Sequence, residues 1–291
     1  MAQPTLLAIV NPLSGTASVQ KKQQWIEFLL KIAVDAGFTP EARFTTHPGH
    51  ATELATEAVR QGIRRVVIIG GDGTMNEAAR ALLNTQTALG IVPVGSGNGL
   101  ARHLQLPLNP KKAIERAVQG RPVVIDSGRI NEHAFFCTTG IGFDAHVARE
   151  FARQPIRGLP TYIRTTYRAF WNYQPATYEI DGKPQSLFSL TVANAGQFGN
   201  NAWIAPRANV ADGLLDVCLL KPFPRSAVGL LAWRLFNKTL DQSNYLTLRP
   251  ARSVVVKGAE PLLIHVDGEP LLLDTDMATV QVVPSSLLVI R

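Results

Sequence analysis

The stretch RRVVIIGGDGTMNEAARALL, residues Arg64 to Leu83, decides how the first half of this chain folds. Its apolar, β-branched run Val66–Ile69 predicts a fully buried strand. The glycine-rich turn Gly70–Thr74 ends that strand. A helix is predicted directly afterwards, because apolar residues recur there at spacings of three and four: Met75, Ala78, Ala79, Leu82 and Leu83.

A strand that turns through glycines into a helix is a natural place for an anion. Several backbone N–H groups and the positive end of the helix dipole point at one spot, and phosphate is the usual occupant. Glycines let the backbone approach a bulky anion and adopt positive φ. The turn Gly70–Thr74 is therefore predicted to bind phosphate.

The same alternation of strand, turn and helix is predicted on both sides of this stretch. The strand Leu6–Val10 breaks into Asn11–Gly15, and the strand Leu89–Val94 breaks into Gly95–Gly99. Alternating strands and helices indicate a parallel sheet, whose following loops emerge at one carboxyl edge. Three loops rich in Gly, Ser, Thr and Asn at one edge favour a phosphate-binding crevice over plain turns.

The pattern changes near Val123, after which strands dominate. We expect a second domain that is all-β or mostly antiparallel, interrupted by helical pieces at 161–173 and 226–240. A final strand, Ser286–Ile290, could pack in either domain. The 291 residues suit about two domains at roughly 150 residues each.

The composition narrows the class of partner. The net charge of +7 favours an anionic partner, such as nucleotide phosphates, acidic lipid headgroups or nucleic acid, or simply a solvated surface. Cys137 and Cys218 lie in apolar runs without metal spacing, which fits a reducing, cytoplasmic setting. No apolar run reaches the ~18 residues of a membrane span, so contact with a membrane is expected from its surface.

Several common catalytic motifs are missing. No Gly-Lys-Ser/Thr follows a strand, the histidines lack zinc spacing, and there is no Gly-x-Ser-x-Gly elbow. Phosphate charge must then be met by backbone amides, helix ends, a divalent metal and arginine. Asp72, inside the glycine turn, is interpreted as holding Mg²⁺ through water, and the alternative is a turn residue that bonds its own backbone.

The second half carries three more Asp-Gly pairs, at Asp181, Asp212 and Asp267. Each lies between strand-like runs, so a hairpin turn is a strong interpretation for all of them. The pattern alone does not rank them.

Taken together, these residues resemble the diacylglycerol kinase catalytic domain superfamily, which includes bacterial soluble lipid kinases, sphingosine kinases and ceramide kinase. The matching stretches occur in family order and span nearly the whole chain. They are NPLSG from Asn11, GGDGTMNE from Gly70, VPVGSGNGLAR from Val92, GIGFDA from Gly140, ADGLLDV from Ala211 and VDGEP from Val266.

The resemblance implies an α/β fold class: an N-terminal three-layer α/β nucleotide-binding domain and a C-terminal β-sandwich domain. The ATP-binding domain would span 1–125, with the strand 285–291 returning to it, and the lipid-substrate domain 126–284. ATP would lie in the cleft between them. The residues implied to contact ATP are Asn11, Pro12, Leu13, Ser14, Gly15, Thr45, Gly71, Asp72, Gly73, Thr74, Met75, Asn76, Glu77 and Ser96.

The resemblance also ranks the Asp-Gly pairs. Asp212 corresponds to the residue that binds a structural Mg²⁺, with backbone carbonyls of Asn209 and Leu214 beside it, while Asp181 stays a turn. Asp267 and Glu269 fall where the family places its catalytic carboxylates. A lipid hydroxyl is a poor nucleophile, so a carboxylate must take its proton. Asp267 is predicted to be that base, with Glu269 as its rival and Asp72 ordering Mg²⁺.

One position departs from the bacterial diacylglycerol kinase pattern. Where those kinases commonly read Gly-Thr-x-Asn-Asp, this chain reads Gly95-Ser96-Gly97-Asn98-Gly99. The glycine in place of the second acid resembles the sphingosine and ceramide kinases. Both a diacylglycerol-like and a sphingoid substrate therefore stay open.

A lipid substrate needs a route from the membrane. Basic residues alternate with aromatic and aliphatic ones between 149 and 171, a mixture that suits an anionic membrane surface or, equally, a solvated helix with a buried aromatic face. The basic members are Arg149, Arg153, Arg157, Arg164 and Arg168, and the apolar ones are Phe151, Tyr162, Ile163, Phe170 and Trp171. A homodimer is compatible with the sequence.

Three other functions are considered. An activity like that of NAD kinases shares the GGDGT motif, and a nucleotide-binding regulator without catalysis would keep the same loops. The candidate carboxylates argue against the regulator. Nucleic-acid binding rests on charge alone, without a recognised module, and ranks last.

Overall fold

The computed structural model describes residues 5–155 and 158–291, and it divides into two compact units. The first unit lies within residues 1–125 and 285–291, and the second comprises 126–284. The strands β5 (Pro122–Ile130) and β16 (Met277–Ile290) carry the chain out of the first unit and back into it. Each unit is described by itself.

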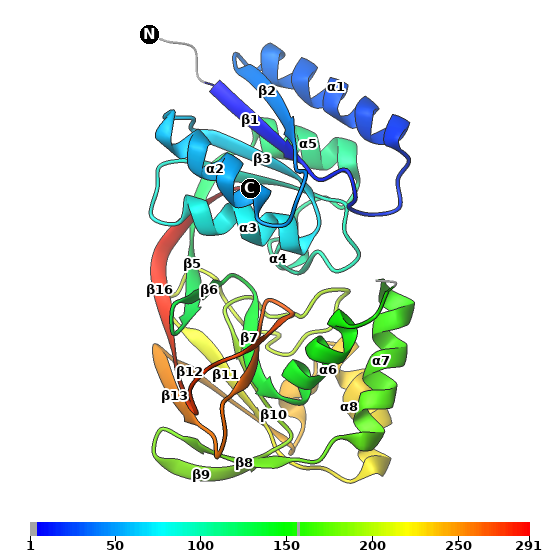
Figure 1. The fold of residues 1–291 in the computed structure, drawn as a ribbon, viewed down its shortest axis with the longest axis vertical. Helices are drawn as coiled ribbons and strands as arrows, with labels where there is room; N and C mark the ends of the chain where they lie inside the picture. Colours follow the sequence, from blue (N-terminus) through cyan, green and yellow to red (C-terminus); the bar gives the residue numbers. More distant parts are fainter. Residues whose placement is uncertain (1–4, 156–157) are drawn as a thin grey trace. The chain divides into compact units, whose positions relative to one another are not determined.

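The first unit alternates strands and helices around a parallel sheet (Figure 1). Neighbouring strands run in the order β2-β1-β3-β4, and Val289 of β16 pairs in parallel with Leu89 of β4. Its elements are β1 (Thr5–Val10), α1 (Val19–Asp35), β2 (Thr39–Phe44), α2 (His50–Arg60), β3 (Arg65–Gly70), α3 (Asp72–Leu82), β4 (Ala88–Pro93), α4 (Gly99–His103) and α5 (Pro110–Gln119).

This unit has three layers, as predicted. The strand residues Leu6, Val67 and Val92 pack with α1 and α5 in one core cluster, while α2 and α3 cover the other face of the sheet (Figure 1). Side-chain oxygens cap the starts of two helices: Ser18 caps α1 and Asn109 caps α5. All the parallel strands end at one edge, so their loops gather there.

The second unit is built mainly from antiparallel strands. One sheet runs β12-β11-β10-β7-β14-β15, and the other contains β16, β13, β8 and β9, with β5 and β6 beside β16. The remaining elements are β6 (His133–Phe135), β7 (Thr138–Gly142), α6 (Phe143–Ala152), α7 (Leu159–Asn172), β8 (Ala176–Ile180), β9 (Lys183–Leu187), β10 (Ser189–Ala193), β11 (Leu215–Leu220), η1 (Arg225–Ala227), α8 (Val228–Phe236), η2 (Leu240–Gln242), β12 (Leu246–Ala251), β13 (Ser253–Lys257), β14 (Leu263–Val266) and β15 (Glu269–Leu272).

The two sheets enclose a shared core, which makes this unit a β-sandwich. Leu190, Val217 and Ile264 of one sheet pack in the same buried cluster as Ile180 and Val254 of the other. The predicted class of the second domain is thereby confirmed.

Two features of the second unit differ from the sequence expectation. Helix α6 was not predicted, because GIGF after Thr139 reads as a continuing strand, whereas Gly142 at φ +88° turns the chain into a helix. The last strand begins at Met277 rather than at Ser286.

Arg157 lies outside the described residues. Among those residues, no helix has the length and apolar character needed to cross a membrane.

Candidate active site

The loops after β1 and β3 are tied together at the carboxyl edge of the first unit's sheet. Asn11 Nδ2 donates to Thr74 Oγ1 over 2.8 Å, and the Asn11 amide donates to the Ile69 carbonyl over 3.0 Å. Asn11 Oδ1 also accepts from the Leu13 amide over 2.9 Å, which shapes the loop from within. The structure therefore brings Asn11–Gly15 and the start of α3 into one constellation.

Gly15 joins this loop to the end of β4. It has φ +68°, and a Cβ built on it would lie 2.1 Å from the Val94 carbonyl oxygen. Only glycine fits so close an approach in the left-handed region. Gly15 thus fixes how closely the loop lies against the strand that leads into Gly95–Gly99.

We expect Gly15→Ala to weaken ATP binding by at least about tenfold, because the loop must move away from β4 and a strained φ costs roughly 1 kcal/mol or more. Isothermal titration with a non-hydrolysable ATP analogue measures this. Gly37→Ala is the matched control, since Gly37 also has positive φ, at +82°, but nothing lies within 4 Å of its added Cβ. Equal loss of affinity in both variants would contradict the assignment of this loop.

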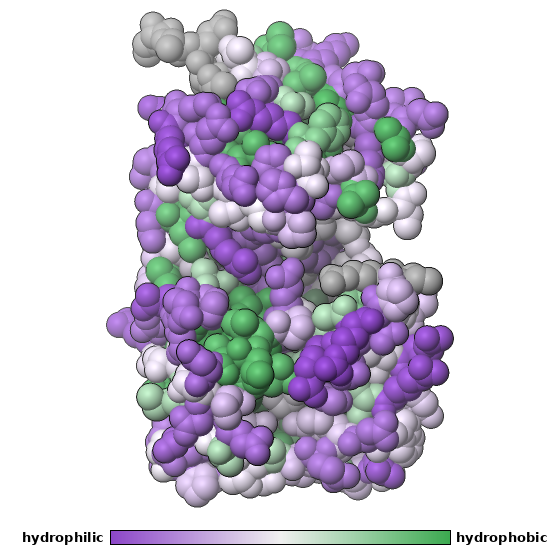
Figure 2. Space-filling view, in the orientation of Figure 1, coloured by the Kyte–Doolittle hydropathy of each residue, from purple (hydrophilic) through white to green (hydrophobic). Residues whose placement is uncertain are grey.

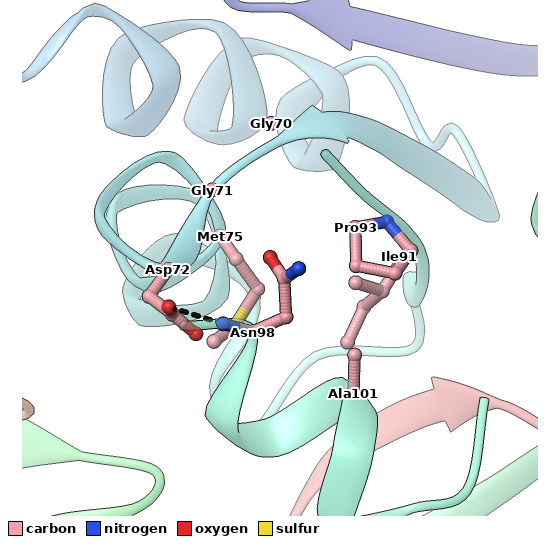
Figure 3. A pocket seen from close by; sticks show the side chains of 8 residues that line it. All are labelled: Gly70, Gly71, Asp72, Met75, Ile91, Pro93, Asn98 and Ala101. Atoms are coloured by element: carbon pink, nitrogen blue, oxygen red, sulfur yellow. Dashed lines mark hydrogen bonds between the residues drawn. The ribbon is translucent and has the colours of Figure 1, made fainter. Parts of the chain in front are cut away.

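Asp72 clamps the loop after β4 onto the start of α3 (Figure 3). Its Oδ2 accepts from the Asn98 amide over 2.7 Å, and its Oδ1 accepts from the Gly99 amide over 2.8 Å. Burial raises the pKa of Asp72, while these amides and the charge of Arg102 act in the opposite direction. Both carboxylate oxygens are thus engaged with backbone amides, and the Mg²⁺-ordering role of Asp72 stays a prediction.

A small pocket lies beside this clamp (Figure 3). Its wall combines the glycine turn with apolar side chains from α3, β4 and α4. The lining residues are Gly70, Gly71, Asp72, Met75, Ile91, Pro93, Asn98 and Ala101. The glycine turn therefore borders a partly apolar recess in the first unit.

A larger groove passes the same loop, and cations that sequence reasoning missed line it. Lys21 near the start of α1, Lys111 in the first turn of α5 and Arg102 of α4 all border this groove, together with Gly95 and Asn98. Cations beside helix N-termini suit anionic groups. No motif marked Lys21 or Lys111, and Arg102, which ends VPVGSGNGLAR, was not singled out as a cation, because the three converge only through the fold.

The other residues predicted to contact ATP differ in their hydrogen-bond partners and in their burial. Thr45 follows β2 and donates its amide to the Val10 carbonyl over 2.9 Å. Glu77 accepts from the Ala51 amide over 3.2 Å and so caps α2, whose N-cap residue is Gly49. Thr74, Met75 and Asn76 are buried, Gly71 and Ser14 are partly buried, and Pro12, Leu13, Gly73 and Ser96 are exposed.

In the second unit, Asp267 occupies the turn between β14 and β15. Its carboxylate accepts from the amides of Phe136, Cys137 and Thr138 over 2.9, 2.7 and 3.0 Å. Burial raises the pKa of Asp267 to about 6, although the amides and the nearby His265 favour the ionised form. Such a carboxylate is held rigidly and titrates close to neutral pH, which suits a general base.

Glu269 and Asp181 are two further acidic residues at hairpins of the second unit. Glu269 begins β15, two residues after Asp267, and is exposed. Asp181 has φ +49° and lies in the hairpin between β8 and β9, where it accepts from the Val255 amide over 2.9 Å. Asp181 thus acts as a turn residue.

A buried polar network that the sequence did not reveal supports the Asp267 turn. His265 Nε2 lies 3.3 Å from Asp144 Oδ2, which also accepts from Thr191 Oγ1 over 2.6 Å. His265 Nδ1 accepts from the Gly268 amide over 3.3 Å, so Nε2 carries the proton toward Asp144. Asp144 belongs to GIGFDA and Thr191 to β10, and only the fold unites them.

The turn at Asp212 gathers oxygen ligands. Asp212 is exposed and accepts from the Leu214 amide over 3.0 Å, and Asp126 accepts from the Gly213 amide over 2.8 Å. Burial, and then the charge of Asp212, raise the pKa of Asp216, so these two carboxylates repel each other. Oxygen donors with excess negative charge fit a hard cation such as Mg²⁺.

The oxygen atoms at the Asp212 turn do not form a metal site made of carboxylates alone. Within residues 5–155 and 158–291, no group of three or more His, Cys, Asp or Glu side chains could together hold a metal ion. Asn209, whose Oδ1 accepts from the Ala211 amide over 3.1 Å, precedes the turn and Leu214 follows it. A cation here would need backbone carbonyls and water besides Asp212.

Family models match both units of the chain. The family described as the diacylglycerol kinase catalytic domain matches residues 5–130, and the YegS C-terminal NAD kinase beta sandwich-like domain matches 137–291. A protein of Pseudomonas putida named probable lipid kinase YegS-like is 32% identical over 246 residues, covering 81% of each chain. A relative of the same name from Pseudomonas fluorescens is 30% identical over 272 residues, covering 91% of this chain and 84% of that one.

Solved structures share the fold. A structure titled as a putative diacylglycerol kinase from Bacillus anthracis has a TM-score of 0.82 at 22% identity, covering 99% of this chain and 97% of that one. Another, titled as a diacylglycerol kinase from the same organism, has a TM-score of 0.78 at 20% identity, covering 100% and 98%. With its two domains matched in order, the chain belongs to the diacylglycerol kinase catalytic domain family.

Proposed function

We propose that this protein is an ATP- and Mg²⁺-dependent lipid kinase that phosphorylates the hydroxyl of a diacylglycerol-like or sphingoid lipid. The observation that carries the proposal is the set of loops that Asn11, Gly15 and Asp72 hold together at the carboxyl edge of the parallel sheet. Such an edge is where open α/β sheets bind phosphates. Relatives named as probable lipid kinases support the substrate class.

In the proposed reaction, the oxygen of the lipid hydroxyl attacks the γ-phosphorus of ATP. The Asp267 carboxylate takes the proton of that hydroxyl at the same time. The bond from that phosphorus to the β-γ bridging oxygen breaks, and ADP leaves with the electron pair. Phosphoryl transfer depends mainly on positioning and on neutralising charge at the γ-phosphoryl group. The loop amides around Asn11–Gly15 and Gly71–Thr74 supply donors for that purpose.

Mg²⁺ has two proposed places on this chain. Bound with the nucleotide, near Asp72, it would neutralise phosphate charge, which is the chemistry it supplies in phosphoryl transfer. Bound at the Asp212 turn, with the carbonyls of Asn209 and Leu214, it would have a structural role. There it would relieve the repulsion between Asp212 and Asp216.

We expect Mg²⁺ to raise the melting temperature of the wild-type protein and to raise that of Asp212→Asn much less, because the substitution removes a charged oxygen ligand. Thermal unfolding with and without MgCl₂, in the absence of nucleotide, measures the difference. Asp181→Asn is the control, since Asp181 lies in another Asp-Gly turn of the same unit and pairs with Arg249 rather than facing a second carboxylate. An equal Mg²⁺ effect in all three proteins would remove the structural site.

The substrate is tested by a screen with labelled ATP. Monoacylglycerol, diacylglycerol, ceramide, sphingosine and undecaprenol are presented in mixed micelles, and NAD is included in solution. We expect a phosphorylated lipid. Labelled NADP instead would establish the NAD kinase-like function, and nucleotide binding without any labelled product would establish the regulator.

The proposed setting is the cytoplasm, at the inner face of a membrane, where a long-chain lipid substrate resides. A homodimer is the proposed assembly if the protein self-associates. Equilibrium sedimentation of the full chain measures that state directly.

A further inference from the structure

The second unit exposes two stripes of large apolar side chains on its helices. On α7, Ile163, Tyr167 and Trp171 follow one another at spacings of four, which places them on one helical face. They are 57%, 64% and 40% exposed. The opposite side of α7 is anchored by Thr165 and Ala169, which are buried.

Helix α8 is apolar on both sides, although it lies at the surface. Leu231 is buried in a cluster with residues of β10, β11 and β12, and this fixes one side of the helix on the sheet. Leu230, Trp233 and Phe236 face outward and are 52–58% exposed. A solvated helix would carry polar residues at these positions.

The end of α7 contacts the segment that leads into α8. Arg225, at the start of η1, donates from Nη2 to the Trp171 carbonyl over 3.3 Å, and its guanidinium lies 5.0 Å from the centre of the Trp171 ring. The rings of Phe170 and Phe223 also stack, with their centroids 6.1 Å apart. We name Ile163, Tyr167, Trp171, Leu230, Trp233 and Phe236 the α7–α8 surface.

The two segments that carry this surface contain basic residues but no acidic ones. The chain contains no Asp or Glu between 151 and 178 or between 217 and 240. The described basic residues of these segments are Arg153, Arg164, Arg168, Lys221, Arg225, Arg234 and Lys238. Figure 2 shows hydrophilic side chains gathered over α6 and the adjoining part of α7, which pack together.

Glu150 of α6 directly precedes the first of these segments, and two arginines pair with it. Glu150 accepts from Arg153 Nη1 over 2.9 Å and lies 3.8 Å from Arg149 Nε. The α7–α8 surface therefore combines exposed apolar and aromatic side chains with basic residues of the same segments.

This combination selects an anionic bilayer over other occupants. Tryptophan, tyrosine and arginine favour the headgroup level of a membrane, and leucine and phenylalanine favour the acyl region just below it. Each Lys or Arg near an anionic bilayer strengthens binding about fivefold. The helices of 14 and 9 residues can lie in the interface but cannot span it.

We propose that the α7–α8 surface docks this protein on anionic membranes, with Leu230, Trp233 and Phe236 entering the interface and the basic residues contacting headgroups. The proposal adds a binding partner to the proposed lipid kinase, but it rests on separate residues. It also refines the expectation for 149–171, because Phe170 packs against Phe143, Phe188 and Phe223 rather than facing solvent.

Sedimentation with vesicles tests the proposal, using phosphatidylcholine alone and phosphatidylcholine mixed with phosphatidylglycerol. We expect the wild type to bind the anionic vesicles, and added NaCl to weaken that binding. Leu230→Ser/Phe236→Ser should bind at least about tenfold more weakly, since two apolar side chains no longer enter the interface. Arg164→Gln/Arg168→Gln should lower binding to anionic vesicles only.

The control is Val34→Ser, which removes a 60% exposed apolar side chain from α1 in the first unit and should bind as the wild type does. Circular dichroism verifies the fold of every variant. Equal binding to neutral and anionic vesicles, or unchanged binding of Leu230→Ser/Phe236→Ser, would overturn the proposal. A third outcome would also overturn the proposal: the wild type is a dimer, and Leu230→Ser/Phe236→Ser is a monomer that still binds vesicles. The α7–α8 surface would then contact a second copy of the chain rather than a membrane.

The outcome is separable from that of the proposed function. Vesicle binding is measured without ATP, and the Asp267→Asn chain is expected to bind vesicles as tightly as the wild type. A protein that binds anionic vesicles through this surface but phosphorylates nothing would keep the docking proposal and remove the kinase. A protein that phosphorylates lipid without binding vesicles would do the reverse.

Discussion

Asp267→Asn is expected to lower the rate of lipid phosphorylation by roughly a thousandfold or more, since a positioned general base contributes about 10²- to 10⁴-fold. The amide side chain cannot take the proton of the lipid hydroxyl. ATP binding should persist, because the candidate phosphate loops belong to the first unit. Single-turnover assays with labelled ATP measure the rate, and titration calorimetry measures the nucleotide affinity.

The paired variant Glu269→Gln decides between the two carboxylates of the hairpin. Asn at 267 also loses one acceptor for the amides of Phe136, Cys137 and Thr138, so its thermal stability must be compared with that of the wild type. Rapid turnover in Asp267→Asn together with loss in Glu269→Gln would transfer the base to Glu269. Turnover in both variants would exclude a base in this hairpin.

The pH dependence follows from the raised pKa of Asp267, which is about 6. A general base must be ionised, so kcat/KM should be constant at higher pH and should fall as the pH drops through about 6. The slope should approach tenfold per pH unit. Glu269→Gln should keep this profile. A profile that stays flat down to pH 5 would contradict the assignment of Asp267.

Asp72→Asn should lower kcat/KM for ATP by about a hundredfold, the second largest effect expected. An asparagine amide group would face either the Asn98 or the Gly99 amide, so one hydrogen bond becomes a contact between two donors. The loop after β4 would then separate from the start of α3, and the proposed phosphate site would lose its shape. Steady-state kinetics at varied ATP concentrations measure the loss.

A titration with Mg²⁺ distinguishes the two roles considered for Asp72. If the residue acts as a clamp, the apparent Mg²⁺ affinity at saturating ATP should change by no more than about twofold. If it orders the metal, that affinity should fall at least about tenfold, since a charged ligand is lost. Asp181→Asn, at a turn in the second unit, should leave both kinetics and Mg²⁺ dependence unchanged.

The elements near glycine turns were predictable because their information is local. The strand Val66–Ile69 and the apolar face of α3 follow one another within twenty residues, and the structure confirms both. The turn predicted over Gly70–Thr74 is shorter than expected, because α3 already begins at Asp72. The two hairpins at Asp181 and Asp267 follow equally from adjacent residues with positive φ. Helix α6 was missed because GIGF reads as a continuation of the strand before it, and only the positive φ of Gly142 turns the chain into a helix.

The contacts that define the site could not be predicted in the same way. Asp72 binds amides 26 and 27 residues further along, and Asp267 binds amides 129 to 131 residues before it. A turn residue and a clamp look identical in sequence, since the partners are backbone groups that carry no residue signature. The same holds for His265 and Asp144, which are separated by 121 residues.

The α7–α8 surface illustrates a further limit. The sequence marks aromatic and basic residues between 149 and 171 but does not say which face each one occupies. The structure buries Ala169 and leaves Tyr167 exposed, and it turns three apolar residues of α8 outward. The sequence predicts only a helical piece there, because apolar content alone does not show which side of a helix is exposed.

The return of the last seven residues to the first unit has a consequence for biosynthesis. Val289 pairs with Leu89, and the backbones of Arg291 and Arg121 exchange hydrogen bonds of 2.9 and 3.1 Å. On the ribosome, β4 is made well before β16, the strand that pairs with it. The sheet edge beside β4 therefore stays open until β16 has emerged, and a chain that stops before β16 leaves this edge unpaired.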